Sequence, residues 1–197
     1  MKHQTRLLDI LFEGSGVLEL AASLIGITSL LFAAKGNPAG PLLMIVFSLL
    51  YGYISWTFAY YGEMLTYLGM SAPMSLFSLI AWLRNPYQGN HAQVKVGHVG
   101  RRELGWMLLL SVAVTGAFYF LLRYFHTANL LPSTLSVTTS FIAVYLTGRR
   151  SPYYALAYAA NDLVLIVLWL LASLTDRSYC AVLVCFVMFL CGDLYGF

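Results

Sequence analysis

The chain has 197 residues and a formal net charge of +3, with 60% hydrophobic and only 10% charged residues. Soluble domains carry about 25% charged residues, so this composition excludes an ordinary soluble protein and indicates an integral membrane protein. Because hydrophobic stretches occupy most of the length, no room remains for an additional soluble domain.

Residues 1–16 form the first element. Charged residues such as Lys2, Arg6 and Glu13 are mixed with leucines there, and no small-residue cleavage site follows a long apolar core. This pattern predicts an amphipathic lead-in at the membrane interface, and it argues against a signal peptide.

Seven later stretches are long and apolar enough to cross a bilayer as helices, which takes about 20 residues each. They cover residues 17–34, 38–60, 63–83, 105–123, 130–148, 153–174 and 178–197. In the third stretch Pro73 follows Gly69. This combination predicts a kink, which acts either as a hinge or as a static bend.

The seven spans group as three, one and three. Residues 17–83 form a first three-helix unit, a polar cytoplasmic loop covers 84–104, a linker helix covers 105–123, and 130–197 form a second three-helix unit. We therefore expect an all-α integral membrane protein with a single transporter domain. The single linker helix gives both units the same orientation, as in transporters built from parallel repeats.

The two units can be aligned by adding one constant number to every residue number of the first unit. This offset pairs Lys35 with Arg149, Pro38 with Pro152, Ser48 with Asp162, and Ser55 with Trp169. Proline suits the first turn of any helix, so an accidental match is the alternative to a true repeat. In a true repeat we expect the substrate site between the two units.

Lysine and arginine in the short connections indicate the orientation. One side carries Lys2, Arg6, Arg123 and Arg177, and the other carries Lys35, Arg84, Lys95, Arg101, Arg102, Arg149 and Arg150. The second side is richer in positive charge. We therefore expect it to be cytoplasmic, with the N-terminus outside and the C-terminus inside.

The strongest candidate site is the pair Asn161 and Asp162, which lies inside the apolar stretch 153–174. A carboxylate is costly at membrane depth and usually faces a protein interior or a water-filled cavity, so it indicates a functional site. Tyr158 and Trp169 lie on the same helical stripe as Asp162, where their ring faces would attract a flat cation. The alternatives are a structural partner for Asp162 and interfacial positions for the two aromatic residues.

The second span offers a facing stripe with further candidates for substrate binding. They are Ser48, Tyr51, Ser55 and, at the outer end, Trp56. Small polar residues permit the close approach of a ligand, although they serve helix packing more often. Trp56 and Tyr60 form either an entry vestibule or an interfacial girdle.

Several classes of function are excluded by the sequence. The four histidines lie in the tail and loops without ligand spacing, and the three cysteines lack the spacing of a metal site or a disulfide. We find no nucleophile–base pair and no folded basic surface, so we expect no catalytic residue, no metal, no cofactor and no nucleic acid partner. An intramembrane enzyme would require Asp162 beside Asp193 or a histidine.

Segments along nearly the whole chain carry a resemblance to a known family. They are residues 23–26 with 34–37, 47–52, 60–64, 82–87, 149–162 and 193–197. On these segments the chain resembles the PnuC family of bacterial vitamin transporters, which are relatives of the SWEET sugar transporters. The family's plan of three, one and three helices agrees with the hydropathy pattern.

This resemblance implies uptake of nicotinamide riboside across the bacterial inner membrane by facilitated diffusion, followed by trapping through a cytoplasmic kinase. Other members take up thiamine, riboflavin or deoxynucleosides, so these substrates stay open. Many members carry Trp-x-x-Trp-x-x-x-Asn/Asp after two arginines, but here Ala155 and Tyr158 replace the tryptophans before Asp162. The expected partners are the small-molecule substrate and the lipid bilayer, and a homo-oligomer is left open.

The competing interpretation is a substrate-capturing membrane subunit of an energy-coupling vitamin importer. Such subunits usually have six helices and an Ala-x-Ala docking motif in the first helix. The first span here contains two Ala-Ala pairs and no such motif. The number of helices in the structure distinguishes the two interpretations.

Overall fold

Seven helical segments and one β-hairpin make up the part of the chain that the computed structural model describes, residues 17–57, 61–127, 129–175 and 180–197. The predicted lead-in over residues 1–16, Tyr60 and Arg177 lie outside the described residues. The elements are α2 (Val17–Ala34), α3 (Ala39–Thr57), α4 (Tyr61–Thr66), η1 (Tyr67–Ser71), α5 (Ala72–Leu83), β1 (Pro86–Tyr87), β2 (Asn90–Val94), α6 (Arg101–Tyr124), α7 (Leu130–Gly148), α8 (Tyr154–Thr175) and α9 (Cys180–Gly196).

The predicted all-α membrane fold is confirmed. The helix α3, the continuous segment Tyr61–Leu83, and the helices α6, α7 and α8 are each long and apolar enough to cross a membrane. In α2 and α9 the apolar stretches are shorter, Ala21–Ala34 and Val182–Tyr195. The described part of the chain thus has more helical segments than the six of an importer subunit.

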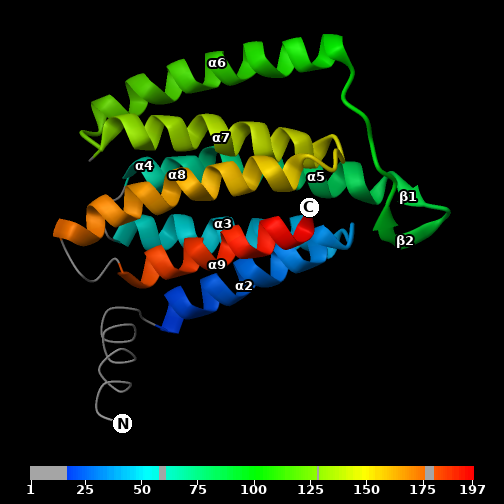
Figure 1. Ribbon diagram of the computed structural model, residues 1–197, viewed down its shortest axis with the longest axis horizontal. Coiled ribbons are helices and arrows are strands. Elements are labelled where there is room, and N and C mark those ends of the chain that lie inside the picture. The colour runs from blue at the N-terminus through cyan, green and yellow to red at the C-terminus, as the bar shows by residue number, and fades with distance from the viewer. Residues whose placement is uncertain (1–16, 58–60, 128, 176–179) are drawn as a thin grey trace.

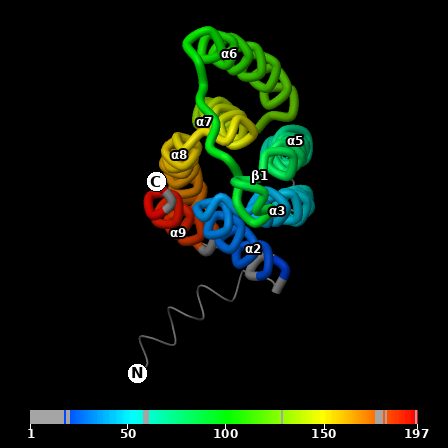
Figure 2. The backbone as a smooth tube through the Cα atoms, turned by 90° about the vertical axis from the view of Figure 1, so that its right-hand side faces the viewer, coloured from blue at the N-terminus to red at the C-terminus, as the bar shows by residue number. Residues whose placement is uncertain are grey.

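Six of the segments form a ring, and α6 lies outside it (Figure 2). The helix α2 packs against both α3 and α9, α8 packs against both α7 and α9, and α5 closes the ring between α3 and α7. The β-hairpin sits at one end of the ring, near the C-terminus (Figure 1). Each unit's first helix therefore touches the other unit's third helix, α2 against α9 and α7 against α5.

The same turn ends the first helix of each unit. The backbone N–H groups of Gly36 and Asn37 donate to the carbonyls of Ala33 and Phe32 at 2.8 and 2.9 Å, and those of Arg150 and Ser151 donate to Thr147 and Leu146 at 2.9 and 3.0 Å. Gly36 and Arg150 both have positive φ, 66° and 58°, as this left-handed helix ending requires. The two turns are related by the offset that aligns the units, which supports a repeat, although the three, one and three grouping stays a prediction.

The third span contains a π-helical turn where the sequence predicts a kink. Tyr67–Ser71 form η1, and Pro73 follows directly in the first turn of α5. Proline lacks an N–H group and its ring clashes with the carbonyl four residues earlier, so the preceding turn widens. The wider turn directs Tyr67 and Ser71 toward the centre of the ring, where both line a cavity.

The long loop is shorter than expected and partly folded. The linker helix α6 begins at Arg101 rather than at residue 105, with Glu103 favourably placed in its first turn. The preceding residues form the hairpin of β1 and β2. The strand β2 and the residues after it join both helix endings, because Val94 N–H donates to the Gly36 carbonyl at 2.8 Å and Gly97 N–H donates to the Arg150 carbonyl at 2.9 Å.

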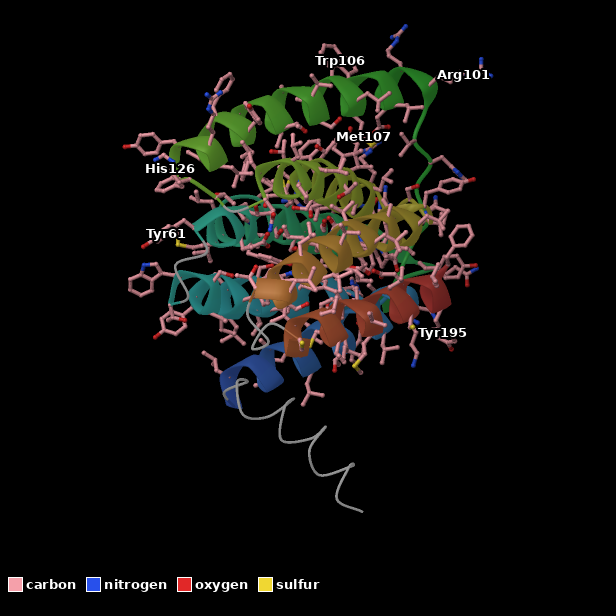
Figure 3. The ribbon with its side chains drawn as sticks, turned by 60° about the vertical axis from the view of Figure 1, so that its left-hand side comes forward. Tyr61, Arg101, Trp106, Met107, His126 and Tyr195 are labelled. Atoms are coloured by element: carbon pink, nitrogen blue, oxygen red, sulfur yellow. The ribbon has the colours of Figure 1, made fainter. Side chains whose placement is uncertain are left out.

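The helix α6 has one protein-facing side and one bare apolar side. Met107 is 4% exposed and faces the bundle, whereas Trp106 is 59% exposed and points away from it (Figure 3). The hydroxyl groups of Thr115 and Thr138 hydrogen bond at 2.7 Å between α6 and α7. The bare side of α6 therefore faces lipid or another membrane-embedded partner.

Candidate functional site

A cavity lies at the centre of the helix ring. Five helices and η1 line it with Gly26, Leu30, Met44, Phe47, Tyr67, Ser71, Ser140, Val144, Tyr158, Asn161, Asp162, Phe186, Phe189 and Asp193. Its volume is about 40 Å³. One water needs roughly 10–15 Å³ by the same measure, so the cavity holds a few waters but no organic substrate until the helices move apart.

Equivalent positions of the two units meet at this cavity. Eight of the lining residues form four pairs related by the offset that aligns the units: Gly26 with Ser140, Leu30 with Val144, Met44 with Tyr158, and Phe47 with Asn161. The cavity therefore lies where a repeat transporter is expected to bind its substrate, between the two units.

Asp162 and Asp193 form the polar part of the cavity wall. Each residue is 3% exposed, and their carboxyl groups lie close enough to interact with each other across the packed pair α8 and α9. No N–H or hydroxyl group of the described residues donates to the buried Oδ2 of Asp162. The pair therefore gives the cavity a negative character that only an incoming cation or a proton can offset.

Asn161 is fixed by the neighbouring helix. Its side-chain oxygen accepts hydrogen bonds from Thr139 Oγ1 at 2.8 Å and from Ser140 Oγ at 2.9 Å, both on α7. With the oxygen held by α7, the amide NH₂ group of Asn161 is left to donate toward the cavity.

Aromatic rings line much of the rest of the cavity. Phe47 of α3 makes edge contacts with Tyr67 and Phe189, with both pairs of ring centroids 5.7 Å apart. Phe186 makes an edge contact with Phe189 at 5.6 Å. Aromatic rings that share a cavity with a carboxyl pair suit a planar, positively charged ring.

The structure separates the two aromatic residues predicted on the Asp162 stripe. Tyr158 lines the cavity, and its hydroxyl group lies near the side chain of Thr147 on α7. Trp169 is 5% exposed and belongs to the hydrophobic core rather than to the cavity wall. It lies two helical turns beyond Asp162, where α8 packs against other helices.

The facing stripe of α3 does not reach the cavity wall in this structure. Ser48 and Ser55 are buried between helices, and Trp56 is 56% exposed at the end of α3. Tyr51 stands behind the wall, with its ring centroid 4.6 Å from that of Tyr67. The face of α3 that lines the cavity is thus shifted by about one residue from the predicted face, since Phe47 rather than Ser48 faces the cavity.

Sequence reasoning missed most of the aromatic wall and left Asp193 aside. Phe47, Phe186 and Phe189 look like ordinary membrane-facing residues in an apolar span. Asp193 carries a visible signal, because it is a second carboxylate within an apolar stretch. The offset does not reveal Tyr67, because η1 changes the helical phase of the first unit.

A larger cavity opens at the hairpin end. It has a volume of about 340 Å³, and Lys35, Tyr87, Arg150, Tyr154 and Phe197 are among its lining residues. Tyr154, which lines this cavity, interacts electrostatically with Asp193 of the central cavity. The cavity at the hairpin end is the wider of these two.

Over residues 16–197 the sequence matches the family described as "Nicotinamide mononucleotide transporter". The chain belongs to this family. A curated relative, the nicotinamide riboside transporter PnuC of Neisseria mucosa, is 28% identical over 193 residues, which cover 94% of this chain and 72% of the relative. The crystal structure of the vitamin B3 transporter PnuC has the same fold, with a TM-score of 0.79 and 24% identity over 97% of this chain and 83% of that chain.

Membership of the nicotinamide mononucleotide transporter family confirms the resemblance and decides between the interpretations. The chain is a multi-pass membrane transporter and not an enzyme. Asp162 does lie beside Asp193, the arrangement that an intramembrane enzyme would require. In this chain the pair is instead part of the wall of the central cavity. The described residues hold no group of three or more His, Cys, Asp or Glu side chains placed for a metal ion.

Proposed function

We propose that the chain carries a vitamin with a cationic ring, nicotinamide riboside, across the membrane by facilitated diffusion with alternating access. The observation that carries this proposal is that the carboxyl pair Asp162 and Asp193 lines a buried central cavity together with several aromatic rings. A permanently cationic pyridinium ring would be stabilised by both groups of residues. The carboxyl pair compensates its charge, and the aromatic side chains contact its ring.

Within this proposal three residues of the cavity wall have distinct roles in substrate binding. Asp162 compensates the charge of the ring, the Asn161 amide donates to a ribose hydroxyl group, and Tyr158 contacts the ring. Trp169, Ser48, Tyr51, Ser55 and Trp56 stay outside this set unless the helices rotate during transport. The curated relative is named for nicotinamide riboside, which favours this vitamin over thiamine, the other cationic candidate.

Alternating access follows from the small volume of the cavity. The space of about 40 Å³ must widen before a nucleoside enters, and the wall is shared between two units that can rock against each other. No energy source is required by this scheme. We propose that net accumulation comes from a cytoplasmic kinase that phosphorylates the product and so removes it from the exchange.

We place the protein in the bacterial inner membrane with the hairpin end in the cytoplasm. Lys35, Arg84, Lys95 and Arg149 belong to connections at that end and Arg101 begins α6 there, which favours the cytoplasmic side. This orientation puts the N-terminus outside and the C-terminus inside. Protease accessibility of the hairpin in sealed, oriented vesicles tests the assignment, and cleavage from the outer side contradicts it.

We also propose a homo-oligomer formed through the bare face of α6. Trp106, Leu109, Val112 and Phe120 are each at least 59% exposed on this helix. Lipid alone can also cover such a face. The mass of the purified protein in detergent, measured by light scattering, distinguishes an oligomer from a monomer covered by lipid. A monomeric mass contradicts the oligomer and leaves the transport proposal untouched.

Uptake into proteoliposomes tests the function directly. Vesicles without ATP or any ion gradient should take up labelled nicotinamide riboside until the inner and outer concentrations are equal. Uptake that needs ATP or an imposed gradient contradicts facilitated diffusion. Competition by unlabelled thiamine, riboflavin and thymidine ranks the alternatives, and neutral riboflavin should compete least because it gains nothing from the carboxyl pair.

A further inference from the structure

The larger of the two cavities, at the hairpin end, is big enough for an organic molecule as it stands. Its volume is about 340 Å³, against about 40 Å³ for the central cavity, and ligand pockets have volumes of roughly 300–1,000 Å³. Its wall includes Lys35 after α2, Arg150 after α7, Val94 of β2, and Tyr154 at the start of α8. We call it the hairpin cavity. Both units and the hairpin therefore contribute to one open site.

The charged side chains on the wall of the hairpin cavity are both cations, Lys35 and Arg150. Neither forms an ion pair or a side-chain hydrogen bond with another described residue. No carboxylate side chain lines the described part of this wall. The hairpin cavity therefore has a positive character, opposite to that of the central cavity, and it suits an anion.

The two cations are not needed to end the helices α2 and α7. Basic side chains near a helix end often bond its last carbonyl groups. Here backbone groups of the hairpin and the residues after it bond the carbonyls of the two turns, from Val94 N–H to Gly36 at 2.8 Å and from Gly97 N–H to Arg150 at 2.9 Å. The side chains of Lys35 and Arg150 are therefore left for another partner.

Arg150 occupies a backbone position that favours glycine. Its φ is 58°, in the left-handed region, and the equivalent position of the first unit holds Gly36 with φ 66°. Residues other than glycine are uncommon in this conformation, and such conformations cluster at ligand sites. An arginine at this turn thus offers its side chain to the cavity where glycine would suit the backbone better.

Aromatic rings share the hairpin cavity with the cations. Tyr87, Tyr154 and Phe197 all line it, and Tyr87 and Phe197 are 47% and 63% exposed. Nucleic acid bases stack on such rings. A phosphate monoester carries about two negative charges near neutral pH, which matches two cations. A lipid headgroup phosphate is a diester with one charge and usually has no flat ring, so a nucleotide matches this wall better.

We propose that the hairpin cavity binds a nucleoside monophosphate, and that the bound nucleotide holds the two units together and slows transport. The phosphate group lies between Lys35 and Arg150, and the base stacks on Tyr154 or Tyr87. One ligand then bridges the ends of α2 and α7. Alternating access requires the units to move against each other, so a ligand that binds this arrangement more tightly lowers the population of the others.

The slowing of transport rests on the proposed function. A kinase that phosphorylates the transported nucleoside yields a nucleoside monophosphate, so accumulated product belongs to the class of ligand that this cavity suits. The two cavities also meet through a pair of rings. Tyr154 lines the hairpin cavity and Tyr158 lines the central one, and their ring centroids are 6.3 Å apart. An occupied hairpin cavity therefore acts directly beside the substrate site.

Calorimetric titration of the purified full-length protein with adenosine monophosphate tests the binding. This probe has a neutral base, which the carboxyl pair of the central cavity does not attract. It should bind at least about tenfold more tightly than adenosine or inorganic phosphate, since each of these supplies only one of the two contacts. Absence of binding, or equal binding of inorganic phosphate, overturns the proposal. Displacement of the nucleotide by phosphatidylglycerol in mixed micelles assigns the cavity to a lipid headgroup and also overturns it.

Substitutions at the two neighbouring arginines locate the site. Arg150→Gly should fold normally, because glycine suits a φ of 58°, and should weaken binding of adenosine monophosphate about tenfold or more. Lys35→Gln should weaken it by a similar factor. Arg149→Gln is the matched control, because Arg149 pairs with Glu103 and does not line the cavity, so its binding should equal that of wild type. Equal affinity in Arg150→Gly and wild type, or equal losses in Arg150→Gly and Arg149→Gln, overturns the site.

Proteoliposomes test the effect on transport. Adenosine monophosphate on both sides of the membrane should slow the uptake of labelled nicotinamide riboside by wild type, whereas Arg150→Gly should take it up at the same rate with and without the nucleotide. Unchanged uptake by wild type at a saturating nucleotide concentration overturns the inhibition. If wild type takes up no nicotinamide riboside even without the nucleotide, the proposed function fails, while the calorimetric titration still decides whether the cavity binds a nucleotide.

Discussion

The two units build opposite walls of one cavity from equivalent positions, but they equip those positions differently. Phe47 and Met44 of the first unit correspond to Asn161 and Tyr158 of the second, and all four line the cavity. The turns that end α2 and α7 have matching hydrogen bonds. The matching turns support the predicted repeat, and the acidic and amide side chains that line the cavity all come from the second unit.

The largest difference in substrate affinity should appear when Asp162 and its equivalent in the first unit, Ser48, are each replaced by alanine. Asp162→Ala should weaken binding of nicotinamide riboside about 100-fold, because the cation loses a buried charged partner worth about 1.5–3 kcal/mol. Ser48→Ala, at the equivalent position of the first unit, should change binding less than about threefold, because the Ser48 hydroxyl group has no hydrogen-bond partner among the described residues and does not line the cavity. Ser48 is fully buried outside the cavity wall.

A binding titration on both purified variants measures this difference. Elution as a single species from a sizing column verifies that each variant is folded. Equal losses in the two variants would show that the units contribute alike, and unchanged binding by Asp162→Ala would remove the carboxyl pair from the site.

A second contrast concerns how closely the helices approach at the turns. A Cβ atom on Gly40 would lie 2.7 Å from the backbone N of Ala33, whereas the equivalent position in the second unit holds Tyr154. Gly40→Ala should therefore destabilise the first unit by about 1–3 kcal/mol through overpacking. Gly116→Ala on α6, with no atom within 4 Å of its Cβ position, should leave stability unchanged or raise it by up to about 1 kcal/mol.

Thermal unfolding of the two glycine variants in the same detergent provides the measurement. The expected order is Gly40→Ala below wild type, and Gly116→Ala at or above it. A Gly40→Ala protein as stable as wild type would mean that α2 and α3 separate easily at this turn.

A third contrast lies within the second unit, between Tyr158 and Trp169. Tyr158→Leu should weaken binding about five- to tenfold, because a ring that contacts a cation contributes about 1 kcal/mol. Trp169→Phe should change binding less than about twofold and should instead lower the melting temperature, because Trp169 packs in the hydrophobic core. Weaker binding by Trp169→Phe alone would restore the tryptophan as the stacking partner.

The fold could be predicted from the sequence to a large extent because a bilayer restricts the choices. Spanning segments must be apolar and helical, so the seven spans are visible from hydropathy, and the predicted second-unit spans 130–148 and 153–174 agree within one residue with α7 and α8. Asp162 and Asn161 are predictable for the same reason, since polar and ionisable side chains at that depth are rare and usually face a cavity or the bundle interior.

The remaining features of the fold and the site depend on contacts between helices, which the sequence alone does not reveal. The helical phase of α3 decides that Phe47 rather than Ser48 faces the cavity, and α3 takes that phase while packed mainly against α2 and α5. The π-helical turn brings Tyr67 into the wall, although the sequence indicates only a bend at Pro73. The hairpin contacts with Gly36 and Arg150 are backbone hydrogen bonds, for which side chains give no signal.

The smallest effect should separate the two basic residues that follow α2 and α7. Arg149 forms an ion pair with Glu103 of α6, and Arg149 Nη2 donates to Glu103 Oε2 at 2.9 Å. Lys35, its equivalent, forms no ion pair within the described residues. Because the Arg149 side chain is 48% exposed, water and salt screen the pair, and Glu103→Gln should lower stability by about 0.5 kcal/mol or less.

Salt dependence distinguishes this ion pair from a packing effect of Glu103. The stability difference between wild type and Glu103→Gln should shrink as salt is raised, because screening weakens an exposed pair in the wild type only. Lys35→Gln should match wild type at every salt concentration. A loss of stability in Glu103→Gln that persists in high salt would point instead to the hydrogen bond from Tyr145, whose hydroxyl group donates to Glu103 Oε1 at 3.3 Å. In that case α6 would be attached to the second unit by packing against α7 rather than by charge.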